Sequence, residues 1–106
     1  MNVRHGDIAW AWIDDGRGNS KLRPIVVIDV NQTVLAVAIT SSPIDVNNRM
    51  YVSLPWHEQG NVSTRLKKQS WAACDWIVDI EIAAIQKVCG HVSDSVLLTI
   101  RARMLS

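Results

Sequence analysis

The apolar residues of this chain fall in short β-branched runs separated by polar or glycine-containing segments, a pattern typical of strands rather than helices. The two strongest runs are Ile25–Val30 and Val34–Ile39, and only residues 31–33 (Asn-Gln-Thr) stand between them. Such a short polar connection predicts an antiparallel hairpin whose side chains fill the centre of a small core. The hairpin is therefore the part of the chain around which the rest is expected to fold.

Further strands are predicted on both sides of this hairpin. They cover Ile8–Ile13, Met50–Leu54, Ser70–Val78 and Ile85–Val88. Residues 79–84 are expected to form one helical turn, and Gly90 to break the last strand. Residues 14–21 and 56–69 lack periodicity and are expected to be loops. Trp10 and Trp12 share one face of the first strand, and we interpret them as core or dimer-surface residues.

The C-terminal segment predicts the one longer helix of the chain. Ser93 suits the N-cap, Asp94 suits the first turn, and Arg101 and Arg103 suit the last turn, where positive charge complements the helix dipole. An apolar stripe faces the sheet, made of Val96, Leu97, Ile100 and Met104. The predicted fold class is therefore mainly β with a C-terminal α-helix.

Size and composition indicate one soluble domain. The chain has 106 residues, of which 48% are apolar and 20% charged, so residues 1–106 are expected to form a single domain with one core. No apolar run approaches the roughly 20 residues of a membrane span. The first residues lack the apolar segment of a secretory signal, and two cysteines are too few for a disulfide framework. A cytoplasmic location is the resulting expectation.

Positive charge is gathered locally, because the net charge is only +1. One cluster precedes the hairpin and consists of Arg17, Lys21 and Arg23; the other lies in a later loop and consists of Arg65, Lys67 and Lys68. Solvated loop charge explains either cluster alone. Both clusters at one rim would instead favour a polyanionic partner.

Polar side chains also flank the hairpin where its two strands meet at one end. Arg23 and Pro24 open the first strand, whereas Thr40 and Ser41 follow the second, so antiparallel pairing brings the two groups together. Asp75 adds an isolated carboxylate among apolar neighbours, which must be paired or catalytic if it is buried. A guanidinium fork and hydroxyl groups are suited to phosphate, and this set of residues fits phosphodiester chemistry.

Several other chemistries are poorly supported. His5, His57 and His91 are far apart in the sequence and no Cys-x-x-Cys pair exists, so no metal site is expected. No Gly-x-Ser-x-Gly segment is present, and Cys74 lies within a predicted strand as a buried, inert thiol. Neither glycine-rich nucleotide fingerprint occurs. We expect no cofactor.

A series of short motifs, in order along nearly the whole chain, resembles the PemK/MazF family of toxin endoribonucleases from bacterial toxin–antitoxin modules. The motifs are Gly6-Asp7-Ile8 with Trp10, Arg23-Pro24-Ile25-Val26-Val27, Ile39-Thr40-Ser41, Asp75, Val78-Asp79-Ile80 and Gly90-His91-Val92-Ser93-Asp94. The resemblance implies a small SH3-like barrel of the CcdB/PemK/MazF type with a C-terminal helix. It also implies a homodimer, a cognate antitoxin partner, and metal-free cleavage of single-stranded RNA at short sequence motifs.

In the family, the strand-opening arginine and the threonine after the third strand are the central catalytic residues, which implies these roles for Arg23 and Thr40. The implied mechanism is attack of the RNA 2′-hydroxyl on the adjacent phosphorus, leaving a 2′,3′-cyclic phosphate and a 5′-hydroxyl. Ser41 would help Thr40 to hold a phosphoryl oxygen, and Asp75 would act as base or orienter. The expected RNA-binding residues are those of the basic clusters, namely Arg17, Lys21, Arg65, Lys67 and Lys68.

This chain departs from the family pattern at two positions beside Asp75. Ala73 stands where some members have an arginine that acts as general acid, and Trp76 stands where many have glutamine. Two alternatives remain open. One is a non-enzymatic, CcdB-like toxin directed at gyrase, although such toxins end in Trp-Gly-Ile and this chain ends in Arg-Met-Leu-Ser. The other is a nucleic-acid-binding barrel without activity.

Overall fold

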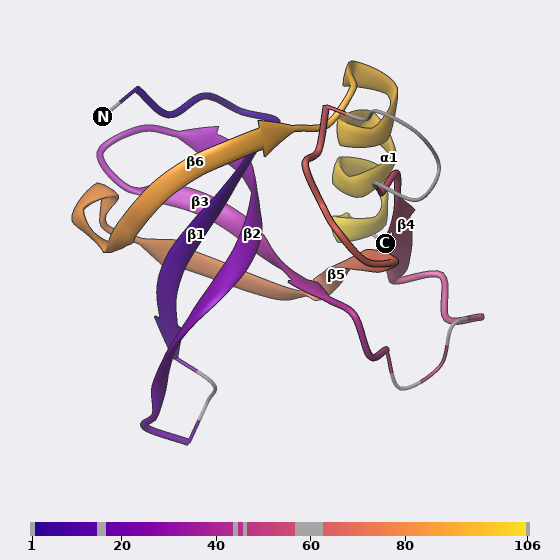
Figure 1. Ribbon diagram of the computed structural model, residues 1–106, viewed down its shortest axis with the longest axis horizontal. Helices are drawn as coiled ribbons and strands as arrows, with labels where there is room; N and C mark the ends of the chain where they lie inside the picture. Colours follow the sequence, from indigo (N-terminus) through magenta and orange to yellow (C-terminus); the bar gives the residue numbers. More distant parts are fainter. Residues whose placement is uncertain (1, 15–16, 44, 46, 57–62, 106) are drawn as a thin grey trace.

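The computed structural model describes residues 2–14, 17–43, 45, 47–56 and 63–105. Its strands are β1 (Asp7–Asp14), β2 (Ser20–Val30), β3 (Val34–Thr40), β4 (Tyr51–Leu54), β5 (Ser70–Ile80) and β6 (Ile85–His91). A 3-10 turn, η2 (Ile82–Ala84), precedes β6, and α1 (Asp94–Met104) follows it. The mainly β class with a C-terminal helix is therefore confirmed (Figure 1).

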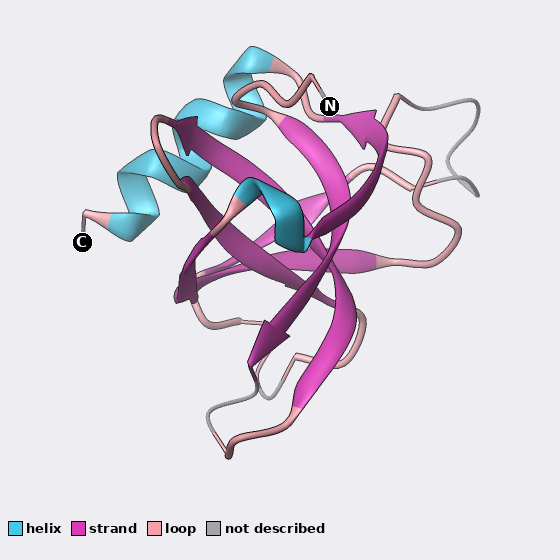
Figure 2. Ribbon diagram, turned by 90° about the vertical axis from the view of Figure 1, so that its left-hand side faces the viewer, coloured by secondary structure: helices cyan, strands magenta, loops and turns pink. Residues whose placement is uncertain are grey.

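The six strands form one antiparallel sheet in the order β4-β5-β3-β2-β1-β6. The sheet is strongly curved, as two perpendicular views show (Figure 1, Figure 2). Strands β4 and β6 are its two edges, because β4 pairs with β5 and β6 pairs with β1. The sheet of the small SH3-like barrel that the resemblance implied is thus not closed into a full barrel.

The predicted hairpin lies in the middle of the sheet, and apolar clusters cover both of its faces. On one face Ile8, Val26 and Val37 pack with Leu97 and Ile100 of α1. The other face is lined by smaller side chains, namely Ala9, Ala11, Ile13, Ile25, Val27, Val34, Ala36, Ala38 and Ile85. Alternate residues of the two hairpin strands serve opposite clusters, as the period of two along a strand requires.

Helix α1 is held to the sheet as its sequence predicted. The Ser93 hydroxyl accepts a hydrogen bond from the Val96 backbone N–H at 3.3 Å, which confirms Ser93 as the N-cap. In the expected apolar stripe, Leu97 and Ile100 are buried, while Val96 and Met104 are partly buried against the same cluster. In addition, the Arg101 guanidinium donates to the Ile28 carbonyl oxygen at 2.6 Å and links the helix to β2. No helix in the described parts of the chain is long and apolar enough to cross a membrane.

Two expected boundaries are wrong for identifiable reasons. Strand β2 begins at Ser20 rather than at Arg23, because residues 20–22 already pair with residues 12–14 of β1. Gly90 was expected to break the last strand but lies within β6. A Cβ atom at Gly90 would overlap the backbone carbonyl oxygens of Ser63 and Thr64, so a close approach of two backbones explains this glycine.

Candidate active site

The site lies where β2 and β3 part from each other. Their ladder ends at the pair Ile25 and Ala38, and the same register, if continued, would set Arg23 opposite Thr40. Beyond that point β3 continues to pair with β5 as far as Thr40, and β2 continues to pair with β1. Pro24 has no N–H to donate between the strands. The gap is therefore flanked by Arg23 on one strand and Thr40 on the other.

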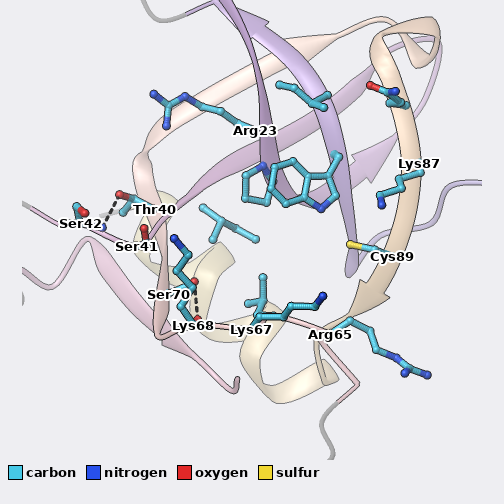
Figure 3. A pocket seen from close by; sticks show the side chains of 16 residues that line it. Arg23, Thr40, Ser41, Ser42, Arg65, Lys67, Lys68, Ser70, Lys87 and Cys89 are labelled. Carbon is cyan, nitrogen blue, oxygen red and sulfur yellow. Dashed lines mark hydrogen bonds between the residues drawn. The ribbon is translucent and has the colours of Figure 1, made fainter. Parts of the chain in front are cut away.

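A pocket of about 1020 Å³ opens over this gap (Figure 3). Its polar lining consists of Arg23, Thr40, Ser41, Ser42, Arg65, Lys67, Lys68, Ser70, Gln86 and Lys87. Its apolar lining consists of Trp10, Leu22, Pro24, Ile39, Leu66 and Cys89. Five of the lining residues are cationic and none, among the residues described, is acidic. The pocket is consequently suited to a polyanion.

Arg23 lines this pocket together with Thr40 and Ser41, and its guanidinium extends to one side of it (Figure 3). The Arg23 Cζ atom lies 5.0 Å from the centroid of the Trp76 ring, a cation–π distance. The Nε atom of Arg23 is buried, and no described residue accepts a hydrogen bond from it. Within the described parts of the chain, the guanidinium is therefore in contact with an aromatic face and with no carboxylate.

Thr40 ends β3 with its hydroxyl fixed by the turn that follows. The Ser42 backbone N–H donates to the Thr40 Oγ1 atom at 3.1 Å. Because this bond uses the oxygen as an acceptor, the hydroxyl proton of Thr40 is left to donate to a ligand. Ser41 is exposed beside it and also lines the pocket. Arg23, Thr40 and Ser41 thus converge as the hairpin pairing predicted, although their roles in catalysis stay predictions.

The later basic cluster reaches the same pocket because the segment before it is anchored. The buried Thr64 hydroxyl donates to the Pro55 carbonyl oxygen at 2.7 Å, and the His91 N–H of β6 donates to the Ser63 carbonyl oxygen at 3.0 Å. Arg65, the next residue, has a left-handed backbone with φ of 59°. This short anchored stretch brings Arg65, Lys67 and Lys68 to the rim that carries Arg23.

The two basic clusters meet at one rim only in part. Arg17 and Lys21 are exposed near the end of the β1–β2 hairpin and are not among the residues that line the pocket. The cause is the extended β2, which carries residues before Arg23 away from the sheet centre along β1. Arg23 is the one member of the first cluster in the pocket.

Asp75 does not lie where a buried carboxylate was expected. Val37 and Ala38 are neighbours in β3, yet their partners in β5 are Ile77 and Ala73, so residues 74–76 form a bulge. Asp75 is exposed in this bulge and does not line the pocket. The argument that an unpaired buried carboxylate must be paired or catalytic therefore does not apply to it, and its role as base or orienter stays a prediction.

Three pocket residues were missed or interpreted differently from the sequence. Lys87 and Gln86 lie on β6, a strand whose short apolar pattern does not predict its pairing register with β1. Trp10, interpreted as structural, lines the pocket and is paired in the sheet with Lys87. A prediction of the β1–β6 pairing would have placed Lys87 beside Trp10, but nothing local in the sequence specifies that pairing.

Neither cysteine has the features of a nucleophile. Cys74 is fully buried, and burial, assisted by the negative charge of Asp75, raises the pKa of its thiol to about 11. Burial also raises the pKa of Cys89, whose Sγ lies 3.4 Å from the Ile8 carbonyl oxygen. Across the described residues, no three His, Cys, Asp or Glu side chains gather closely enough to hold a metal ion.

Comparison with known proteins gives a consistent result. The family model of the PemK-like, MazF-like toxin of type II toxin–antitoxin systems matches residues 4–105. MazF from Deinococcus radiodurans has a similar structure, with a TM-score of 0.75 and 16% identity over 98% of this chain and 94% of that chain. No curated protein sequence matches the chain.

Two further solved structures have similar folds. One is the toxin MazF-mt6 of Mycobacterium tuberculosis, with a TM-score of 0.67 and 17% identity over 92% of this chain and 91% of that chain. The other is an endoribonuclease in complex with its cognate antitoxin from a mycobacterial species, with a TM-score of 0.69 and 16% identity over 97% of this chain and 91% of that chain. At such low identity these structures establish likeness of fold.

Proposed function

Because the chain belongs to the family of PemK-like, MazF-like toxins of type II toxin–antitoxin systems, we propose that it is an endoribonuclease that cleaves single-stranded RNA at short sequence motifs. The observation that carries this proposal is the pocket that Arg23 and Thr40 line together with four further cationic side chains. A protein of similar fold is described as an endoribonuclease, which supports the proposal. Cleavage takes place where β2 and β3 part.

In the proposed reaction, the RNA 2′-hydroxyl attacks the adjacent phosphorus and the bond from phosphorus to the 5′ oxygen breaks. The products are a 2′,3′-cyclic phosphate and a 5′-hydroxyl, so no water is consumed in this step. Arg23 donates to the non-bridging phosphoryl oxygens and stabilises the charge that develops on them. Guanidinium groups stay protonated in proteins, so charge stabilisation is the role that its chemistry favours.

The hydroxyls of Thr40 and Ser41 complete the set of donors around the phosphorus. Thr40 is the better oriented of the two, because its oxygen accepts the Ser42 N–H and its proton remains available. Asp75 is proposed as base or orienter only through movement of its bulge or through a bound water, since it is exposed outside the pocket lining. The proton from the 2′-hydroxyl otherwise passes to solvent in this open site, and the leaving 5′ oxygen takes up a proton from water.

The remaining cations are proposed to bind phosphates along the RNA. Arg65, Lys67 and Lys68 lie on one rim, and Lys87 joins them from β6. Arg17 and Lys21 are proposed as outlying RNA contacts on the β1–β2 hairpin. Affinity for RNA should therefore fall as salt rises, because each neutralised phosphate releases counterions.

The test is incubation of the purified protein with a long RNA in EDTA, followed by mapping of both ends at each cut. The proposal predicts cuts at recurring short motifs, with 2′,3′-cyclic phosphate and 5′-hydroxyl ends. Cleavage that stops in EDTA or leaves 5′-phosphates would contradict the mechanism. If intact RNA remains at every protein concentration, an activity on gyrase or binding without cleavage becomes the better account.

An antitoxin is the proposed protein partner, as structures of similar fold include one in complex with its cognate antitoxin. Its binding segment is proposed to be acidic and partly disordered, occupying the cationic pocket and folding there. The antitoxin should then compete with RNA. A cognate antitoxin that binds tightly while RNA cleavage continues at the same rate would contradict this mode of inhibition.

A further inference from the structure

Trp76 contacts the guanidinium of Arg23 through the face of its indole. Its indole lies under the guanidinium, with 5.0 Å between the Arg23 Cζ atom and the ring centroid. Resting on the proposed function, we propose that Trp76 is a positioning residue, which holds the Arg23 fork toward the phosphate without touching the substrate.

The fold brings these two side chains together from strands that are not neighbours. Arg23 is on β2 and Trp76 on β5, and β3 lies between them in the sheet. Strands β2 and β5 are therefore separated by about two inter-strand spacings, roughly 10 Å. Between them β3 offers Ala36 and Ala38 on the shared face, and these small, buried side chains leave room for the longer ones to meet.

The bulge at residues 74–76 accounts for the orientation of the Trp76 indole. Extra residues in one strand re-aim the side chains that follow, and such bulges occur beside active sites. Trp76 is half-buried and packs against the cluster that contains Ile25 and Ala38, so one side of the ring is held by the core. Its other side is available to the guanidinium.

Stacking has an advantage over an ion pair at this position. The Nε atom of Arg23 is buried without an acceptor among the described residues, so no hydrogen bond at that atom fixes the plane of the guanidinium. A carboxylate partner would occupy the in-plane N–H donors, whereas an aromatic ring contacts the face of the group and leaves those donors unused. The terminal nitrogens can then bind two phosphoryl oxygens at once.

The test compares Trp76→Leu, which loses the aromatic face, with Trp76→Phe, which keeps one, in a single-turnover RNA cleavage assay. Cation–π contacts correspond to about 3- to 30-fold in an equilibrium constant, so Trp76→Leu should lower kcat by about tenfold. KM should change less, and Trp76→Phe should recover most of the rate. Trp12→Leu, which removes an exposed tryptophan outside the pocket lining, is the matched control and should cleave normally.

A second measurement does not depend on cleavage. Protons over the face of an indole resonate upfield, so the Arg23 Nε–H signal, assigned by its loss in Arg23→Lys, should be shifted upfield in the wild type. That shift should disappear in Trp76→Leu and remain in Trp76→Phe. If the wild type fails to cut RNA, the proposed function fails while the shift still decides the stacking.

Three results would overturn the positioning role. The first is an Nε–H signal that does not change in Trp76→Leu. The second is wild-type kcat in a folded Trp76→Leu protein. The third is an equal loss of kcat in the leucine and phenylalanine variants, since a merely structural role for Trp76 would not distinguish an aromatic face from an apolar one.

Discussion

At the scale of single residues, the position of Arg23 and Thr40 at one pocket was predictable and the place of Asp75 was not. Two β-branched runs with a three-residue connection predict a hairpin. The first residues of one hairpin strand and the last residues of the other then lie close together, whatever the rest of the fold is. Asp75 depends instead on a bulge, which leaves no mark in the apolar pattern because Cys74 and Trp76 look like ordinary strand residues. Burial at such a position cannot be inferred from neighbours in sequence.

The hydroxyl of Thr40 is expected to matter for rate and little for stability. Thr40→Val keeps the shape of the side chain but removes the donor, so cleavage should slow on the order of 100-fold. Because Ser42 is exposed, water can replace the lost acceptor, and the free energy of unfolding should change by about 1 kcal/mol or less. Thr40→Ser should stay much closer to wild type in the same assay; equal rates for valine and threonine would contradict this role.

Buried Cys74 gives stability a defined dependence on pH. Its pKa is raised from 9.0 to about 11 in the folded protein, chiefly by burial. As the pH rises, the thiol therefore loses its proton in the unfolded chain before it does so in the folded protein. The contribution of the buried thiol to the free energy of unfolding is complete below about pH 9 and is lost as the pH rises toward 11. Denaturant titrations should show a steeper decline over that window for the wild type than for Cys74→Ala. Parallel declines would contradict the burial argument.

At the scale of elements, the site depends on a contact between β6 and the segment around Thr64. Gly90 permits the Ser63 and Thr64 carbonyls to approach β6, and the His91 N–H bonds to Ser63. From the sequence, Gly90 was predicted to break the strand, because glycine weakens a strand. The close approach of a second backbone, which explains this glycine, is visible only in the structure. The basic residues that follow, Arg65 among them, reach the pocket through this contact.

Gly90→Ala should disturb both the fold and RNA binding. The added methyl group would overlap backbone atoms that cannot rotate away, so overpacking of about 1–3 kcal/mol is expected, with weaker RNA binding as the segment around Thr64 shifts. Thermal melting and an RNA binding isotherm measure the two effects. Wild-type values in both would show that the contact does not position the basic segment.

Arg65→Gly is the complementary variant. Arg65 has φ of 59°, a conformation that glycine adopts without steric cost, so this substitution should not lower the melting temperature. It removes one cation from the rim and should weaken RNA binding while making binding less sensitive to salt. A large loss of stability in Arg65→Gly would contradict the view that the Arg65 side chain contributes charge for RNA binding and is not needed for the backbone conformation.

At the scale of the whole molecule, the sequence predicted the class and the central hairpin but not the openness of the sheet. Closure depends on whether the two edge strands meet, and β4 is only 4 residues long and pairs with one end of β5. Whether the edge strands pair depends on residues far apart in the sequence, so the local apolar pattern does not predict it. The edges and the exposed apolar side chains, including Trp12 and Leu98, leave surface that a second copy could cover.

We therefore propose that the protein forms a homodimer. Exposed apolar residues on a small domain favour association when they are covered by a symmetric partner. Sedimentation equilibrium at micromolar concentration should give twice the 11.8 kDa mass of the chain. A single monomeric species across that range would contradict the homodimer, although it would leave the pocket and its chemistry in place.

The central claim is that Arg23 acts directly on the phosphate, and the rate of RNA cleavage by Arg23→Ala tests it most directly. Loss of a donor to the developing charge should slow single-turnover cleavage by on the order of 100-fold or more, while the unfolding free energy changes by about 1 kcal/mol or less. Arg23→Lys, which keeps the charge but lacks the planar fork, should also be slow. A folded Arg23→Ala protein that cuts RNA at the wild-type rate would contradict the assignment of the active site.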